Sequence, residues 1–404
     1  MEPMPSTRAV SIGVWIGIGA RDEPDEVAGV SHFLEHLLFK GTDTRSATQI
    51  SQSVDRVGGD INAYTSKEYT TFYCRVPARV VDFGIELLGD VLTAPALRDV
   101  DIESERQVIL DELAMDDDSP EDVVHRVFAE QVFERHALGR DTAGERGTVG
   151  TVSGDQIRRF FAERYRAGNT VVAIAGAVDA DDVIDCVERS FSALAPGDGR
   201  TPRDSPEGVG RSLELEDETE QMHIVVGGRS LRRDDPDREA LDVVNHVLGG
   251  GLSSRLFDEI RERRGLAYSV FSNAAAYADS GMWSVYAGTL PDNAEIVRRL
   301  ISTELERLVS EGITEEELAV AQGYLTGSYE MGLEDSSARM SRLGGQLTVL
   351  GRVRPVEEQI ARWEAVTLSD TERVIGRVYA PAPLTVTLGP RAARSRSRRV
   401  RSHA

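Results

Sequence analysis

The chain has few of the residues that cross-link proteins. Only two of its 404 residues are cysteine, Cys74 and Cys186, and neither has a second cysteine at metal-binding spacing. Two isolated cysteines exclude a disulfide framework and are typical of small core residues in a reducing compartment. We therefore expect a cytoplasmic protein whose fold does not depend on disulfides.

Long apolar runs are missing as well. No stretch approaches the roughly 20 residues that a membrane-spanning helix needs, and the first fifty residues show no cleavable signal pattern. The sequence therefore predicts neither a membrane span nor a membrane partner.

Lysine is almost absent, and positive charge is in the minority. Lys40 and Lys67 are the only lysines, a bias toward arginine that we attribute to genome composition. The 46 Lys and Arg residues are outnumbered by 68 Asp and Glu residues, so the formal net charge is -22. This charge disfavours binding to nucleic acid and favours solubility. The length and the 40% hydrophobic content predict two or three globular domains.

A histidine–glutamate motif stands near the start of the chain. His32, Glu35 and His36 form the pattern H-x-x-E-H, the inverse of the zinc-protease signature H-E-x-x-H. On a helix over residues 32–39 these side chains share one face. Two imidazoles one turn apart can bind one zinc ion, and a carboxylate beside them can take a proton from the water that zinc binds. For this motif alone, two structural histidines on a buried helix are the alternative.

A catalytic zinc needs a third protein ligand. Glu105 and Glu112 lie seven residues apart in the segment 103–113, whose apolar spacing and lack of glycine and proline predict a helix. Seven residues make about two turns, so both carboxylates share one face. One could bind zinc while the other orients a histidine. The alternative is an acidic face in contact with solvent.

These motifs and their flanks resemble the pitrilysin, or insulinase-like, metallopeptidases, and in particular bacterial proteases similar to the mitochondrial processing peptidase. The matching segments are Gly41-Thr42, Gly58-Gly59, Asn62-Ala63-Tyr64-Thr65 and Val108-Ile109-Leu110-Asp111-Glu112. The resemblance implies that His32, His36 and Glu112 bind Zn2+. It also implies that Glu35 activates the water and that Glu105 is the supporting acid.

The resemblance extends to the second half of the chain. Arg261 and Tyr268, seven residues apart, match an arginine and a tyrosine that contact substrate in the family. A tyrosine hydroxyl can donate to a developing oxyanion, and a guanidinium can hold a peptide carbonyl. The alternative is a surface arginine and a half-buried strand tyrosine. Family members of this length usually receive this domain from a second subunit, which implies a clamshell homodimer with both residues acting in trans.

Asn62 and Ala63 match the family's substrate-side edge strand. An extended peptide could add to such a strand by backbone pairing. The resemblance therefore implies peptide substrates, either unfolded peptides or short polypeptides, which are cleaved with weak sequence preference in an enclosed chamber.

The order of the expected elements indicates a duplicated α+β domain, and the resemblance implies that each copy is a mostly antiparallel sheet packed with helices. A linker at 196–210 divides a zinc-binding domain, 1–200, from a homologous domain without zinc, 211–390. Strands expected at 171–176 and 384–389 lie at equivalent points of the two copies. Residues 391–404 are predicted to be a disordered Arg-rich tail, with an RNA- or partner-binding arm as the alternative.

The first expected strand, residues 10–18, begins abruptly. Family members usually carry another short strand before it, and only residues 1–7 precede it here. We therefore expect a start that is truncated or misassigned, because an unpaired edge strand is a liability.

Taken together, these motifs predict a zinc-dependent endopeptidase. Two alternatives are a non-catalytic structural or partner subunit of a processing complex and a dedicated leader-peptide processing protease. The other histidines before the tail have no ligand at metal spacing and are expected to be structural: His125, His136, His223 and His246.

Overall fold

In the computed structural model of the protein, the structure of residues 1–390 is described. Within this range the chain forms two five-stranded sheets with equivalent strand orders, β1-β5-β2-β4-β3 and β6-β10-β7-β9-β8. In each sheet the first edge strand is parallel to its neighbour, and the other strand pairs are antiparallel. The predicted duplicated α+β fold is confirmed.

The strands of the first sheet are β1 (Glu2–Pro3), β2 (Ala9–Ile16), β3 (Asp60–Thr65), β4 (Thr70–Pro77) and β5 (Thr170–Gly176). Those of the second sheet are β6 (Leu213–Glu216), β7 (Met222–Ser230), β8 (Ala267–Ala276), β9 (Gly281–Thr289) and β10 (Leu384–Gly389). β5 and β10, the two strands expected at equivalent points, occupy the same place in the two sheets. A short strand, β1, precedes β2 and pairs with β5. The first sheet therefore contains the additional strand that we expected to be missing.

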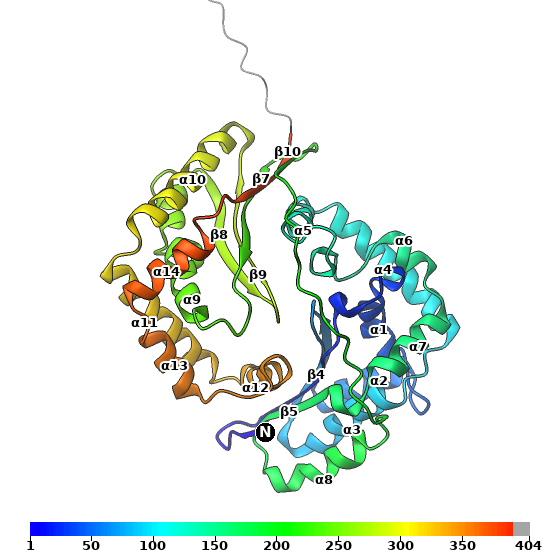
Figure 1. The fold of residues 1–404 in the computed structure, drawn as a ribbon. Coiled ribbons are helices and arrows are strands. Elements are labelled where there is room, and N and C mark those ends of the chain that lie inside the picture. Colours follow the sequence, from blue (N-terminus) through cyan, green and yellow to red (C-terminus); the bar gives the residue numbers. More distant parts are fainter. Residues whose placement is uncertain (391–404) are drawn as a thin grey trace, which may run out of the picture.

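Helices cover both sheets (Figure 1). In the first half they are α1 (Val30–Leu38), α2 (Ala47–Val57), α3 (Val81–Thr93), α4 (Asp99–Asp117), α5 (Pro120–Val132), α6 (Arg146–Thr151), α7 (Gly154–Arg164) and α8 (Ala180–Phe191). In the second half they are α9 (Arg238–Asn245), α10 (Ala294–Glu311), α11 (Glu315–Gly332), α12 (Ser336–Leu350), α13 (Val356–Glu364) and α14 (Leu368–Val378). The segment 192–212 contains no helix or strand. We propose it as the linker between domains 1–200 and 211–390.

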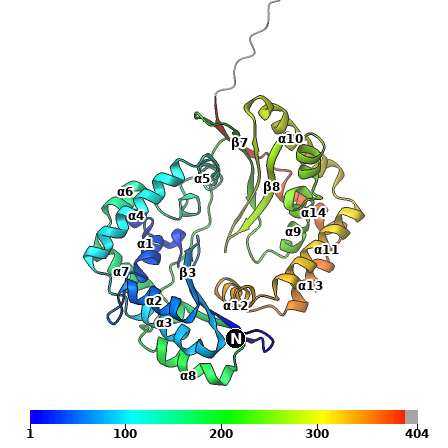
Figure 2. The same ribbon diagram turned by 180° about the vertical axis from the view of Figure 1, so that it is seen from behind.

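The two halves exchange one helix each. α12, from the second half, packs on β2 and β5 of the first sheet, and α5, from the first half, packs on β7 and β10 of the second sheet (Figures 1 and 2). Each sheet thus buries one face against its own helices and part of the other face against a helix of the other half. Neither half completes its own packing alone.

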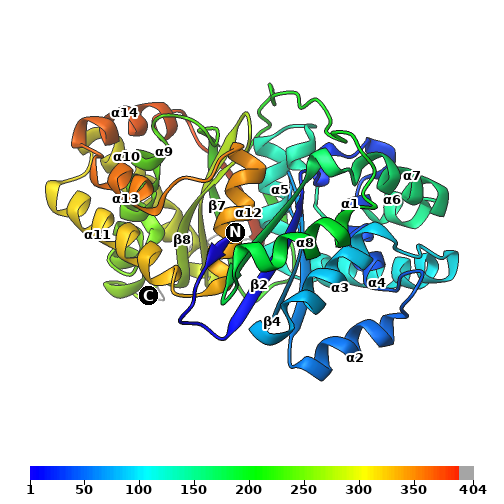
Figure 3. The same cartoon turned by 90° about the horizontal axis from the view of Figure 1, so that it is seen from below.

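The exchanged helix α12 approaches the first sheet closely at glycines. A Cβ atom on Gly344 would lie 2.1 Å from the buried ring of Trp15, and one on Gly13 would lie 2.1 Å from Met340 Sδ. Figure 3 shows α12 at the junction of the two halves, near the N-terminus. There Glu2 pairs with Arg339 and Arg342 at 2.5 and 2.6 Å.

A buried charge cluster also joins the halves. Arg21 pairs with Glu68 at 2.7 Å and with Asp279 of the second half at 3.0 Å. Glu68 also pairs with Arg233 of the second half, and Arg203 of the linker holds Asp22 at 2.8 Å. Opposite charges that are removed from water together hold their partners in place, so this cluster adds to the packing of α5 and α12 in joining the halves.

Among residues 1–390, every helix is too short or too polar to span a lipid bilayer. Both cysteines are buried free thiols, and burial raises the pKa of Cys74 to about 12. The predicted disordered tail, residues 391–404, lies outside the described residues.

Candidate metal centre

Helix α1 carries the H-x-x-E-H motif and is anchored at its first turn. It follows Gly29, whose φ of 95° is a left-handed conformation that suits glycine. The buried carboxylate of Glu23 accepts hydrogen bonds from the amides of Gly29 and Ser31, both at 2.7 Å. These amides have no partner within the helix, so Glu23 holds the start of α1 in place.

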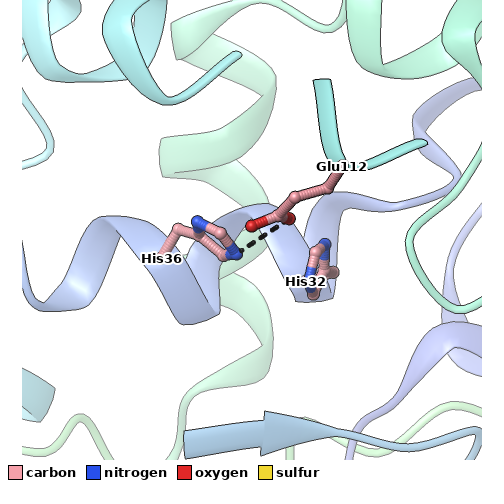
Figure 4. Close-up of side chains that lie close together, drawn as sticks. All are labelled: His32, His36 and Glu112. Carbon is pink, nitrogen blue, oxygen red and sulfur yellow. Dashed lines mark ion pairs between the residues drawn. The ribbon is translucent and has the colours of Figure 1, made fainter. Parts of the chain in front are cut away.

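The side chains predicted to bind metal converge between α1 and α4. One ligand atom from each of His32, His36 and Glu112 lies within 4.8 Å of the other two (Figure 4). His36 Nε2 is 3.5 Å from Glu112 Oε2. In the part of the chain that the structure describes, this is the one cluster found with three such donors.

The second nitrogen of His36 has a carboxylate partner. His36 Nδ1 lies 3.2 Å from Oε2 of Glu105, a residue of α4 that is 3% exposed. Lys40 Nζ lies 2.5 Å from the other oxygen, Oε1. A carboxylate in this place fixes the orientation of a histidine ring, which is the role predicted for Glu105. Sequence reasoning missed Lys40, although the scarcity of lysine could have pointed to it.

His32 is held neutral by its surroundings. Burial, with the nearby His36 adding to it, lowers the pKa of His32 to about 4. A neutral imidazole keeps the lone pair that a metal requires. His32 Nδ1 is buried without a hydrogen-bond partner among the described residues. Most buried polar atoms of proteins have a partner, so this atom is an exception that needs an explanation. The two imidazoles and one carboxylate are a donor set of catalytic zinc sites, so these residues fit Zn2+.

Glu35 shares the metal-facing side of α1 and has a hydroxyl partner. Thr65 Oγ1 donates to Glu35 Oε2 at 2.6 Å. Burial raises the pKa of Glu35, and the hydrogen bond from Thr65 opposes that shift. Sequence reasoning quoted Thr65 within a family segment but gave it no role. The contact places the end of β3 against the glutamate of the motif.

β3 is the edge strand of the first sheet and carries the predicted substrate residues. Asn62 is exposed, and Ala63 is 8% exposed. Because an edge strand leaves one row of backbone groups unpaired within its sheet, the backbone of β3 can pair with an extended peptide. The backbone amide of Ala63 donates to Asn62 Oδ1 at 2.8 Å, so a peptide that pairs at this amide would replace that hydrogen bond.

Arg261 and Tyr268 contact each other but not the metal residues. The Arg261 guanidinium stacks over the Tyr268 ring at 4.7 Å. Tyr268 is 81% exposed at the start of β8, so the alternative of a half-buried tyrosine is wrong. Within the described residues, no hydrogen bond or ion pair joins either side chain to His32, His36 or Glu112. Tyr268 lies in β8 of the second half, whereas the candidate metal residues lie in α1 and α4 of the first half, so the two sets of groups come from different halves of the chain.

The other described histidines have structural contacts. His125 stacks with Phe271, His223 bonds the Tyr286 hydroxyl, His246 stacks on Tyr324, and His136 accepts a bond from the Leu138 amide.

The sequence matches two family models. Residues 1–146 match the model described as insulinase (peptidase family M16), and residues 151–325 match the peptidase M16 inactive domain. An uncharacterized zinc protease of Streptomyces coelicolor is 40% identical over 397 residues, which cover 96% of this chain and 86% of that protein. One of Bacillus subtilis is 37% identical over 376 residues, 93% of this chain and 91% of that protein.

Solved structures share the fold. A crystal structure of a peptidase M16 inactive domain from Pseudomonas fluorescens has a TM-score of 0.91 at 20% identity and covers 97% of this chain and 95% of its own. A protease from Helicobacter pylori has a TM-score of 0.89 at 24% identity and covers 96% of both chains.

Proposed function

Because the chain belongs to the insulinase, or M16, family of peptidases, we propose that it is a zinc-dependent endopeptidase for unfolded peptides and short polypeptides. The observation that carries the proposal is the convergence of His32, His36 and Glu112, whose ligand atoms lie within 4.8 Å of one another. Glu35 lies on α1 with His32 and His36, on the side where a general base is needed.

In the proposed hydrolysis of a peptide bond, each residue of the site has a separate role. When bound, Zn2+ would supply a Lewis acid for the scissile carbonyl and would make water more acidic. Glu35 accepts a proton from the attacking water and returns it to the leaving amine. Thr65 holds the Glu35 carboxylate through its hydrogen bond at 2.6 Å. Glu105 holds the ring of His36.

Substrate is proposed to lie between β3 and residues of a second copy of the chain. Backbone pairing with β3 at Asn62 and Ala63 would hold an extended peptide. Arg261 and Tyr268 would hold and polarise its carbonyl. Their stacking and exposure support a role at a surface that faces another copy. The proposed assembly is a clamshell homodimer that acts in trans and encloses its substrate.

The alternatives from the sequence make different predictions. A non-catalytic subunit would accord with the name of the model that matches residues 151–325, but that segment lies outside the metal centre. The proposed metal ligands and the proposed general base are all present in the first half. A dedicated leader-peptide protease would use the same site on a narrower set of substrates. The buried free thiols support the proposal that the protein acts in the cytoplasm.

The test combines metal analysis with cleavage of quenched fluorescent peptides by wild type and Glu35→Gln. We expect about one zinc per chain in both proteins, because Glu35 is not a ligand. Activity should fall by about 10²- to 10⁴-fold in the variant, since the general base is lost. Zinc without cleavage of any peptide by wild type would favour the subunit or the narrow processing enzyme. Absence of zinc from wild type would contradict the metal assignment.

A further inference from the structure

Lys40 is an unusual residue in this chain. It is one of two lysines among 46 basic residues, and it lies just beyond α1, where its backbone amide donates to Leu37 O at 3.0 Å. The side chain reaches across to α4 and ends 2.5 Å from Glu105 Oε1. Apart from Lys40 and Lys67, all the Lys and Arg positions of this chain hold arginine.

The contacts form a chain that leads from Lys40 to the metal ligands. Glu105 Oε1 contacts Lys40, and Glu105 Oε2 lies 3.2 Å from His36 Nδ1. His36 Nε2, on the opposite side of the ring, is 3.5 Å from Glu112 Oε2. The Glu105 side chain is 4% exposed, whereas that of Lys40 is 39% exposed. Lys40 thus brings a solvated positive charge to a carboxylate that has little contact with water.

A buried carboxylate needs a partner for each oxygen, or it loses free energy and rotates toward other partners. In the described part of the chain, Lys40 and His36 are the ionic partners of Glu105. Without Lys40, Oε1 would have no ionic partner, and the carboxylate could turn away from His36.

The choice of lysine over arginine has a geometric reason. The lysine ammonium is a compact point charge, whereas the planar guanidinium pairs with both oxygens of a carboxylate at once. An arginine at position 40 would compete with His36 for Oε2. A lysine leaves that oxygen free to orient the ring.

We propose that Lys40 is a positioning residue of the metal centre, because its ammonium holds Glu105 so that the second carboxylate oxygen sets the orientation of His36. This inference rests on the proposed zinc site. The residues that position His36 are then two, Glu105 on α4 and Lys40 just after α1, and their ion pair links the two helices.

The zinc affinity of a variant without Lys40 distinguishes two roles for this residue, because they predict changes of affinity in opposite directions. If Lys40 acted through its charge alone, its removal would relieve repulsion of a dication and strengthen zinc binding. If it positions Glu105, its removal weakens zinc binding. We expect Lys40→Met to bind Zn2+ about tenfold more weakly than wild type in competition with a chromogenic chelator, the scale typical of lost second partners of metal ligands.

A double-mutant cycle tests whether Lys40 acts through Glu105. Glu105→Gln should weaken zinc binding, and Lys40→Met should cause no further loss in that background. Arg56→Met is the matched control, because Arg56 is an exposed residue of α2 and its loss removes the same charge. It should bind zinc like wild type.

Unchanged or tighter zinc binding by Lys40→Met would overturn the inference, as would additive losses in the double variant. If Lys40→Met fails to fold, as judged by thermal melting of the metal-free chain, Lys40→Gln is judged by the same criteria. Absence of zinc binding by wild type would overturn the proposed function and the inference with it. Zinc binding by wild type with no effect at position 40 would overturn the inference alone.

Discussion

At the residue scale, two polar side chains of the candidate metal centre each have one neighbour that orients them. His36 is held by Glu105, and Glu35 is held by Thr65. Thr65 is the last residue of β3, so the strand proposed to bind the peptide also holds the proposed base. If the proposed function holds, substrate binding and proton transfer are linked through the Thr65 hydroxyl.

Replacement of Thr65 by valine should lower kcat by about tenfold, because a hydrogen bond to a charged group of about 1.5 kcal/mol or more is lost. Zinc content should not change, since the side-chain hydrogen bond of Thr65 goes to Glu35, which is not one of the proposed ligands. Steady-state peptide cleavage measures the change. Thr65→Ser keeps the hydroxyl and should retain most of the activity. Full activity of the valine variant would show that Glu35 needs no such partner.

At the element scale, α12 depends on the half of the chain to which it does not belong. Its residues come from the second half, yet Met340 and Gly344 pack against Trp15 and the first sheet. The absence of a side chain at Gly344 allows the helix to lie against the Trp15 ring. The adjacent Gly345 has no atom within 4 Å of the place of a Cβ atom. Two neighbouring glycines of one helix thus have different surroundings.

We expect alanine substitutions at Gly344 and Gly345 to have opposite effects on the free energy of unfolding. Gly344→Ala should lower the free energy of unfolding by about 1–3 kcal/mol, because the added methyl group overpacks the contact with Trp15. Gly345→Ala should raise it by up to about 1 kcal/mol, since alanine favours the helix. Urea denaturation of both variants measures the difference. Equal stabilisation by both would show that α12 does not pack closely on the first sheet.

At the scale of the whole molecule, one chain presents two separate sets of groups. The metal centre lies in the first half, and the stacked pair Arg261 and Tyr268 lies exposed in the second half. Ion pairs such as Arg21 with Asp279 join the two halves of one chain. A second copy is the natural source of the missing groups if the site works in trans.

Mixing two inactive variants tests this arrangement. Glu35→Gln lacks the base, and Tyr268→Phe lacks the proposed oxyanion donor. If the site forms in trans, an exchanged equal mixture should recover about a quarter of wild-type activity, because half of the dimers are mixed and each holds one intact site. A site formed within one chain would recover no activity on mixing. Sedimentation of each variant alone serves as the control for dimer formation.

Much of the fold could be predicted from the sequence because it depends on local order. The H-x-x-E-H motif placed a helix at 32–39 and apolar spacing placed one at 103–113, and the structure has them at Val30–Leu38 and Asp99–Asp117. The repeated order of strands and helices indicated the duplication. The H-x-x-E-H spacing alone puts His32, Glu35 and His36 on one helix face, because the helical period fixes the directions of the side chains.

Only the tertiary structure decided which distant residues meet. The exchange of α5 and α12, the contact of Thr65 with Glu35 and that of Lys40 with Glu105 join segments whose sequences carry no mark of the partner. Periodicity determines which face of an element is buried, but packing and buried charges determine what lies against that face.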